Sequence, residues 1–483
     1  MINPAVQKVV GFLIAASSLM MLPPALVSWW YHDDTVMLFL LPAVILIIIG
    51  MAVFLPVRST SQELRLREGF LVVVLSWLVL ALVGAIPFLL LKQPSLTYVD
   101  ALFESMSGLT TTGATIFTQI DNLPRAILYY RQQLQWLGGM GIIVLAVAIL
   151  PMLRVGGMQL FRAETPGPMK DSKLTPRITE TAKALWLIYV GITVVCAFAY
   201  WLGGMQLFDA IGHAFSTVAI GGFSTHEASM GYWNSVELEV IAMTFMAISG
   251  INYALHFTAW RHASMQSYFV DPELRVYAGL LFGISFLASM ALFLSGAYDS
   301  LTEAFRYGTF QVFSALTTTG FTTAPFYQWT GFVPLGLILI AFIGGCAGST
   351  AGGMKVIRTI LLYRQAAREI RRLIHPRAVI PIKYGGLTTS PTVMDAIWGF
   401  FFLYIASFVF MSVLLAATGV DTVTAFSAVA ACITNLGPAL GEAGPHYANL
   451  NDPSKIVLAI AMLLGRLEIY TLFVLITPTY WKG

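Results

Sequence analysis

A short polar sequence recurs four times in an otherwise apolar chain, and it constrains the fold more than any other feature. The copies are residues 107–115, 216–225, 314–323 and, more weakly, 431–439. Aligned on their glycines, they place Gly113, Gly222, Gly320 and Gly437 at one equivalent position. The copies are about 100 residues apart, and a regular period of this kind marks an internal repeat. The sequence therefore predicts four repeats of one structural unit.

The composition indicates a polytopic membrane protein. Of 483 residues, 57% are hydrophobic and 11% charged, whereas a soluble protein carries about 25% charged residues. The net charge of +3 gives no indication of nucleic-acid binding. The three cysteines, Cys196, Cys346 and Cys432, are far apart and odd in number, so neither a disulfide framework nor a metal site is predicted.

The apolar segments divide the chain into an N-terminal hairpin and four repeats. Residues 9–30 and 35–55 each approach the ~20 residues that a bilayer requires, and we interpret the first as a retained helix. Each repeat then has a helix, a short half-helix, the polar loop and a second helix. The first helices are expected at 69–91, 184–202, 276–298 and 396–420, the half-helices at 100–109, 209–217, 301–316 and 421–433, and the second helices at 132–153, 240–260, 329 onward and 456–479.

This pattern predicts an all-α polytopic membrane protein with ten spanning segments. Four helix–pore-half-helix–filter-loop–helix repeats would surround one pore, beside the N-terminal two-helix hairpin. The boundaries are 1–68 for the hairpin and 69–165, 166–270, 271–383 and 384–483 for the repeats.

The polar loops have the chemistry of an ion filter. Backbone outside a helix at membrane depth must be buried in protein or line water, and glycine permits the positive φ that turns successive carbonyls toward one axis. Four such loops could replace the hydration shell of a monovalent cation such as K⁺. The alternative is close helix packing through small residues, which needs no common register. The predicted filter residues are Thr110, Thr111, Thr112, Gly113, Ala219, Ile220, Gly221, Gly222, Thr317, Thr318, Thr319, Gly320, Thr434, Asn435, Leu436 and Gly437.

A second cluster of small residues, 344–353, predicts an intramembrane gate. Its glycines are Gly344, Gly345, Gly348, Gly352 and Gly353, and each costs about 1 kcal/mol in a helix interior. We expect an irregular loop lining the water-filled path; close helix packing is the alternative. Arg466, near the middle of segment 456–479, needs a cavity or a partner. We expect it to meet carbonyls or hydroxyls of 344–353, because Glu468 at i+2 faces elsewhere.

Two further patterns concern the surroundings of the filter. Glu104, His213 and Gln311 each precede a filter glycine by nine residues, and we expect them to hydrogen-bond behind the filter. The links between repeats, 154–183, 261–275 and 355–383, carry most of the Lys and Arg residues, whereas the filter side carries few, Arg131 among them. The positive-inside rule then places the links and both termini in the cytoplasm.

The loop motifs Thr-Thr-Thr-Gly-Ala-Thr, Ile-Gly-Gly-Phe-Ser-Thr, Thr-Thr-Thr-Gly-Phe-Thr and Thr-Asn-Leu-Gly-Pro-Ala resemble those of the Trk/Ktr/HKT superfamily of cation transporters. The N-terminal hairpin favours its Trk branch, with TrkH-type potassium uptake subunits. The resemblance implies K⁺ as the transported ion at the filter, no organic cofactor, and a gate at 344–353. It also implies a homodimer in the inner (plasma) membrane with one pore per subunit, above a ring of cytoplasmic nucleotide-binding (TrkA-like) subunits. The fourth loop departs most from the threonine pattern.

Three other functions were weighed. A sodium-permeable or proton-coupled symporter of the same fold remains open, as does a non-conducting receptor. An enzyme would need a nucleophile–base pair or a metal-ligand cluster within the membrane. The apolar segments contain almost no acids or histidines, so no enzymatic activity is expected.

Overall fold

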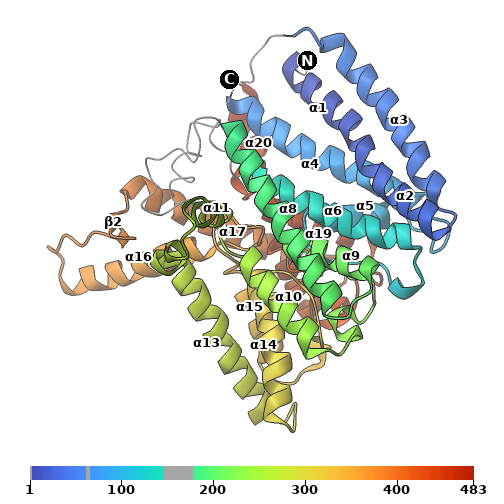
Figure 1. The fold of residues 1–483 in the computed structure, drawn as a ribbon. Coiled ribbons are helices and arrows are strands. Elements are labelled where there is room, and N and C mark those ends of the chain that lie inside the picture. Colours follow the sequence, from blue (N-terminus) through green and yellow to red (C-terminus); the bar gives the residue numbers. More distant parts are fainter. Residues whose placement is uncertain (1–2, 61–65, 145–177, 483) are drawn as a thin grey trace.

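The computed structural model describes residues 3–60, 66–144 and 178–482, and these form a helical molecule (Figure 1). The one sheet in this part of the chain is a hairpin of β1 (Lys383–Tyr384) and β2 (Leu387–Thr388). The prediction of an all-α polytopic fold is confirmed. Most of the first basic link, 154–177, and the boundary between repeats one and two lie outside the described residues.

The N-terminal hairpin forms as predicted, with a break in its first arm. That arm consists of α1 (Pro4–Ser17), the 3-10 turn η1 (Ser18–Met21) and α2 (Leu22–Tyr31); α3 (Val36–Phe54) and η2 (Leu55–Val57) return. A proline pair in the first turn of α2 removes two helical donors, which explains the break. The arms pack closely, because a Cβ on Gly11 would lie 2.7 Å from the backbone nitrogen of Phe54.

Each repeat begins with a long apolar helix followed by a half-helix. The long helices are α4 (Leu66–Leu89), α8 (Ile178–Leu202), α13 (Pro272–Leu294) and α17 (Pro391–Ala417). The half-helices are α5 (Tyr98–Leu109), α9 (Leu207–Val218), α14 (Leu301–Thr317) and α18 (Thr422–Ile433). Two of them carry an acidic residue at their start: Asp100 completes a capping box with Thr97, and Asp421 caps α18. Anions suit this end of a helix.

The second helices depart from the prediction. Repeat one has α6 (Arg125–Val144), which reaches the limit of the described residues. Repeat three has α15 (Val333–Ile340), an irregular segment, and then the amphipathic α16 (Val356–Ile374). In repeat two, α10 (Val236–Ser249) and α11 (Tyr253–His262) meet at 91°, followed by α12 (Gln266–Val270). In repeat four, α19 (Asp452–Arg466) and α20 (Tyr470–Ile476) meet at 115°, before α21 (Pro478–Lys482).

The expectation of unbroken helices at 240–260 and 456–479 was therefore wrong. At the first break, Gly250 O accepts from Cys346 N and Tyr253 N donates to Gly348 O, so the 344–353 segment replaces the lost helical bonds. At the second break, Glu468 and Ile469 have positive φ, and Glu468 pairs with Arg358 at 3.0 Å. Helix breaks at membrane depth are tolerated where neighbouring groups satisfy the freed backbone.

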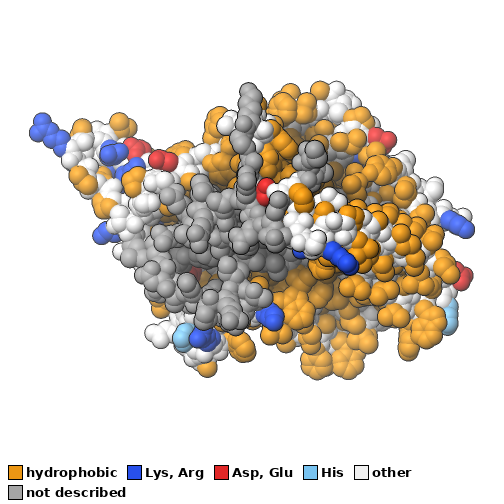
Figure 2. All heavy atoms as spheres, turned by 90° about the horizontal axis from the view of Figure 1, so that it is seen from above, with side chains coloured by type: hydrophobic (Ala, Val, Ile, Leu, Met, Phe, Trp, Pro, Cys, Tyr) orange, Lys and Arg blue, Asp and Glu red, His pale blue; other side chains and the backbone are white. Residues whose placement is uncertain are grey.

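Six described helices are long and apolar enough to cross a membrane, or up to eight if each bent pair counts as one span. The two remaining predicted spans are the one that contains α6, which reaches the limit of the described residues, and the one that begins with α15 and continues into the irregular segment. Hydrophobic side chains cover much of the visible surface on the right of Figure 2. Lys and Arg side chains gather at the projecting end on the left, where Figure 1 draws the β hairpin.

Candidate functional site

The four half-helices end in the same backbone motif. A residue just beyond the end of each half-helix has a left-handed conformation. These residues are Thr111 (φ +50°), Ile220 (+55°), Thr318 (+64°) and Asn435 (+57°). The next N–H then donates to the carbonyl five residues back, from Thr112 to Ser107 (2.9 Å), Gly221 to Ser216 (2.8 Å), Thr319 to Ser314 (2.8 Å) and Leu436 to Ala431 (2.7 Å). This is the Schellman arrangement, which normally uses glycine at the left-handed position.

None of these four residues is glycine, so the backbone is strained at each of them. A β-branched residue such as Ile220 or Thr318 is an outlier at positive φ, and such conformations cost about 1–3 kcal/mol each and cluster at functional sites. All four side chains are buried within the loops. The strain is repeated at one register in every repeat, so the fold maintains it for a common purpose.

The four predicted filter glycines follow two residues later, and all have positive φ: +82° at Gly113, +80° at Gly222, +83° at Gly320 and +93° at Gly437. Each also touches the next loop. A Cβ on Gly113 would overlap the carbonyl oxygen of Gly221, one on Gly222 that of Thr319, one on Gly320 that of Leu436, and one on Gly437 that of Thr112. These contacts run from each loop to the next and back to the first, so the predicted filter residues form a closed ring.

Buried hydroxyls tie two of the loops to their half-helices. Thr110 and Thr112 join through their Oγ1 atoms at 2.8 Å, and Thr317 and Thr319 do so at 2.7 Å. Thr110 also donates to Met106 O at 2.7 Å. The fourth loop, which departs most in sequence, joins the first instead, since Asn435 Nδ2 donates to Thr112 Oγ1 at 3.0 Å.

The three residues expected behind the filter do form hydrogen bonds there. The Glu104 carboxylate accepts from Ile116 N (3.0 Å) and pairs with Arg131 (2.7 Å). His213 Nε2 bonds to Ser224 Oγ at 2.9 Å, and Gln311 Nε2 donates to Ala324 O at 3.3 Å. Each group therefore fixes the chain leaving its own filter loop.

Arg131, which the sequence analysis counted among the charges on the filter side, is not exposed at the mouth. It is fully buried. Breaking a buried pair by removing one partner is strongly destabilising, so Arg131 and Glu104 act as one structural unit.

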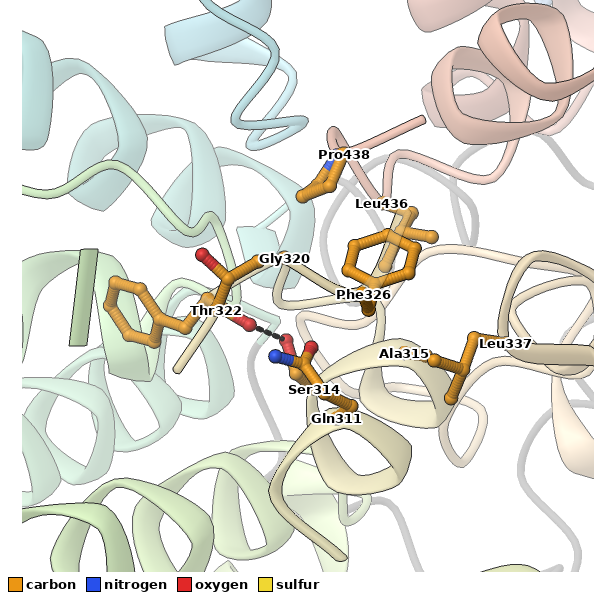
Figure 3. Close-up of a pocket in the computed structure, with 10 residues that line it drawn as sticks. Gln311, Ser314, Ala315, Gly320, Thr322, Phe326, Leu337, Leu436 and Pro438 are labelled. Atoms are coloured by element: carbon orange, nitrogen blue, oxygen red, sulfur yellow. Dashed lines mark hydrogen bonds between the residues drawn. The ribbon is translucent and has the colours of Figure 1, made fainter. Parts of the chain in front are cut away.

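Figure 3 shows the back of the third loop, where a small pocket separates it from the fourth. Gln311 and Ser314 of α14 point toward the extended segment from Gly320 to Thr322. Leu436 and Pro438 line the other side of the pocket. Ser314 Oγ donates to Phe321 O at 2.7 Å, the dashed line in the figure. The segment that follows Gly320 is thus held by polar groups of its own half-helix.

The second loop is held from another repeat by polar side chains of α6, of which the sequence analysis named only Arg131, as a charge on the filter side. Arg131 Nη1 donates to Ser224 O (3.2 Å), Gln132 Nε2 to Phe223 O (3.3 Å) and Gln135 Nε2 to Gly221 O (2.6 Å). Three glutamines at 132, 133 and 135 in an expected membrane helix were an available signal, because polar residues at membrane depth mark functional paths.

Residues 344–353 form an irregular segment, as the sequence predicted, and most of the segment is buried; that it lines a water-filled path stays a prediction. Gly344, Gly348 and Gly353 have φ of +73°, +72° and +70°, whereas Gly345 and Gly352 have ordinary φ. Gly352 N donates to Thr318 Oγ1 (2.7 Å) and Gly353 N to Thr434 O (3.1 Å). The segment therefore lies directly against filter loops three and four, at the ends of their half-helices.

Arg466 joins this segment to the filter. Its guanidinium donates to Thr350 O at 3.1 Å and also to Thr111 Oγ1. The expectation that Arg466 meets a carbonyl of 344–353 is confirmed, and the contact with the first filter loop is additional. Arg466 is buried at the end of α19, where backbone carbonyls lose their helical partners.

A buried carboxylate holds the other side of the segment. Glu273 Oε1 in the first turn of α13 accepts from Ala347 N (2.9 Å) and from Ile357 N (3.1 Å). One oxygen thus spans from the middle of the segment to the start of α16. Sequence analysis missed Glu273 because it began this helix at residue 276.

At the mouth, His226 links the loops that follow the first and second filters. Its Nδ1 lies 2.5 Å from Asp121 and its Nε2 3.7 Å from Asp209, and its ring stacks on Tyr232 at 3.5 Å. Partial burial acts to lower the pKa of His226, but hydrogen bonds and charges of Asp209 and Asp121 outweigh it and raise the pKa above its usual 6.5. The mouth therefore contains a titratable link between two repeats.

The arrangement suits coordination and passage of a bare cation rather than covalent chemistry. Backbone carbonyls and hydroxyls dominate the ring, and among the described residues no group of three or more His, Cys, Asp or Glu could hold a metal ion. Carbonyl rings select monovalent cations by replacing their hydration shell.

Comparisons with known proteins identify the family to which the chain belongs. Residues 36–482 match the family profile TrkH, described as a cation transport protein. The chain is 56% identical to the Trk system potassium uptake protein TrkH of Halomonas elongata and 52% to that of Escherichia coli K12, in each case over 90% of both chains. It is also similar to the crystal structure of the potassium transporter TrkH from Vibrio parahaemolyticus, with 49% identity, a TM-score of 0.92 and full coverage of both chains.

Proposed function

Because this chain belongs to the TrkH family of cation transport proteins, which are transporters and not enzymes, we propose that it takes up potassium ions through one pore lined by its four filter loops. The observation that carries the proposal is the closed ring of Gly113, Gly222, Gly320 and Gly437, all at positive φ. The relatives bear the names potassium uptake protein and potassium transporter.

We assign ion coordination to residues 110–113, 219–222, 317–320 and 434–437. Repeated left-handed residues followed by a left-handed glycine reorient successive peptide planes, which is what a row of inward carbonyls needs. The negative ends of four half-helix dipoles converge on the same ring and favour a cation there. Potassium gives up its water more readily than sodium, so a rigid ring of oxygens favours potassium.

We further propose that residues 344–353 gate this pore and that Arg466 latches the gate. Support comes from the bonds of Gly352 and Gly353 to the filter and from the bond of Arg466 to Thr350. An irregular backbone at membrane depth is tolerated where it is buried or lines water. The same segment can therefore be packed in one state and line a path in another.

The remaining inferences concern location and partners. We propose insertion in the inner membrane with both termini and the basic links in the cytoplasm, following the positive-inside rule. Figure 1 draws both chain ends at the top of the molecule, which agrees with termini on one side. By family resemblance we expect a homodimer and a TrkA-like nucleotide-binding subunit. We place the docking of that subunit near α16, whose last turn carries Arg371 and Arg372.

Rubidium and sodium uptake into vesicles containing the purified protein tests the proposal. Uptake of rubidium well above sodium, without a requirement for a proton gradient, is expected. Equal uptake of both ions favours a sodium-permeable transporter, and uptake that needs a proton gradient favours symport. An absence of cation flux in inserted protein overturns the proposal and favours a receptor.

A further inference from the structure

The second filter loop lacks the side chains that brace the first and third. In those loops, hydroxyls three residues and one residue before the glycine join each other: Thr110 with Thr112, and Thr317 with Thr319. The equivalent positions in the second loop are Ala219 and Gly221, which have no hydroxyl. Its loop nevertheless has the same φ pattern, with Ile220 at +55° and Gly222 at +80°.

Gln135, from α6 of repeat one, fills the missing position. A Cβ on Gly221 would overlap the carboxamide of Gln135, so this group lies where a side chain of residue 221 would begin. Gln135 Nε2 donates to Gly221 O at 2.6 Å, and its Oε1 accepts from Phe223 N at 3.1 Å. The side chain is fully buried, and both its polar atoms are bonded.

These two bonds fix the peptide planes on both sides of Gly222. In a trans peptide the C=O points opposite to the N–H. Because Phe223 N–H points toward Gln135, the carbonyl of Gly222 points away from α6. The Gly221 carbonyl is held directly by the amide. One glutamine thereby orients Gly222, whose own loop has no hydroxyl at either bracing position.

We propose that Gln135 is a positioning residue for ion selectivity, replacing from another repeat the hydroxyl that Thr112 and Thr319 supply within their own loops. The inference rests on the proposed function of the ring as a filter. It predicts that the second loop loses its fixed carbonyl orientation when the carboxamide is removed. Potassium selectivity should fall, since it depends on oxygens held at a set spacing.

The test is rubidium and sodium uptake into vesicles by variants of the full chain. In Gln135→Ala the rubidium-to-sodium ratio should fall about fivefold, the effect expected from losing the net contribution of about one hydrogen bond. Gln135→Met keeps the side-chain volume and removes the polar contacts. It should lower the rubidium-to-sodium ratio by a similar factor, and it replaces Gln135→Ala in the test if that variant does not fold.

Rescue distinguishes bracing from space filling. Gly221 has an ordinary φ, so it can carry a side chain once the carboxamide is gone. The triple variant Gln135→Ala/Ala219→Thr/Gly221→Thr should recover most of the ratio, because it restores both hydroxyls that join in the first and third loops. Gln135→Ala/Ala219→Val/Gly221→Val has the same shape without the hydroxyls and should not recover it. Equal recovery by both variants would overturn the bracing role.

Two further variants complete the experiment. Gln133→Ala removes a buried glutamine on the same helix that donates to Met20 O at 2.9 Å, away from the filter, and should leave the ratio unchanged. Gly113→Ser reports on the filter itself. If it lowers the ratio but the Gln135 variants do not, the inference about Gln135 is wrong. If neither lowers the ratio, the proposed filter is wrong.

Discussion

Arg466 donates a hydrogen bond to the backbone oxygen of Thr350 across 3.1 Å, and so links the bend of repeat four to the segment 344–353. The same guanidinium contacts Thr111 in the first filter loop. The cationic group therefore lies between the filter and the proposed gate. We propose that the charge at that place both repels cations and holds the segment in position.

We expect Arg466→Ala to raise rubidium flux by roughly fivefold or more, because hydrogen bonds to charged groups contribute about 1.5–3 kcal/mol each. Arg466→Lys should give an intermediate flux, since an ammonium keeps the charge but lacks the planar fork. Arg306→Ala, which removes an arginine paired with Glu239 at 2.7 Å, serves as the control. Unchanged or reduced flux in monodisperse, inserted Arg466→Ala would contradict the latch.

Glu273 should anchor the opposite side of the gate. Glu273→Ala leaves Ala347 N and Ile357 N without their acceptor, and each buried unsatisfied donor costs about 1–3 kcal/mol. We expect higher basal rubidium flux together with a lower melting temperature. Glu273→Gln keeps an acceptor oxygen and should stay near the parent in both measurements.

The matched control for Glu273 is Glu239→Ala, because Glu239 is equally buried but pairs with Arg306 outside the gate. It should lower the melting temperature without raising flux. If both variants raise flux alike, leakage follows from general destabilisation, and the anchor loses its support.

The features that the sequence predicted are those that depend on residues close together along the chain. The repeats, the half-helices and the φ of the four glycines follow from composition and register within short segments, so the sequence indicated them. The contact of Arg466 was also foreseeable, because a mid-membrane charge needs a polar partner and the glycine-rich segment was the nearest candidate.

Features that depend on distant partners were not predictable. The breaks at residues 250–252 and 467–469 are stabilised by bonds to Cys346 and Arg358, each more than ninety residues away along the chain. Gln135 fills a space created by a glycine of another repeat. A single sequence does not show which helix faces which loop, so the partners of Gln135 and Glu273 emerge only in three dimensions.

His226 should make stability depend on pH. Its raised pKa means that the folded state holds the proton more tightly than the unfolded state, so the pair with Asp121 and Asp209 stabilises fully below about pH 6.5. That contribution is lost as the pH rises through the folded pKa. We expect the melting temperature to fall across this window, and His226→Ala to flatten the fall.

Asp209, at the same mouth, does not produce the same pH profile. The pKa of Asp209 is lowered from 3.8 by bonds to His226 and Thr225 that outweigh its burial, so its contribution changes only in acid. His262→Ala, at an exposed histidine ending α11, should retain the parent profile. If the melting temperature of His226→Ala depends on pH in the same way as that of the parent, His226 does not cause the pH dependence.

Orientation can be tested with single cysteines, because Cys196, Cys346 and Cys432 are all buried. Arg371→Cys near the end of α16 should react only with reagent on the cytoplasmic side. Glu442→Cys, beyond the fourth filter loop, should react only from outside. The parent chain provides the background, and reversed labelling of the two sites contradicts the orientation derived from the basic links.

The filter glycines give the most direct test of the central proposal. Each has positive φ, and a Cβ on each would overlap a carbonyl oxygen of the next loop. Gly113→Ser should therefore displace a carbonyl of the second loop as well as its own. Losing matched oxygens harms potassium more than sodium, which can pass partly hydrated. We expect a rubidium-to-sodium ratio reduced roughly tenfold, with conduction still measurable, and a similar loss in Gly320→Ser.

The structure also alters the expectation for the fourth loop. Its sequence is irregular and suggested a weaker effect, yet Gly437 has φ of +93° and lies against Thr112 O like the others. We expect Gly437→Ser to match Gly113→Ser. Gly419→Ser is the control, because Gly419 shares a positive φ of +94° but has no atom within 4 Å of an added Cβ. It should destabilise the protein by about 1 kcal/mol through backbone strain and leave the uptake ratio intact. If all three filter variants keep the parent ratio, the ring of glycines is a packing device and does not select ions.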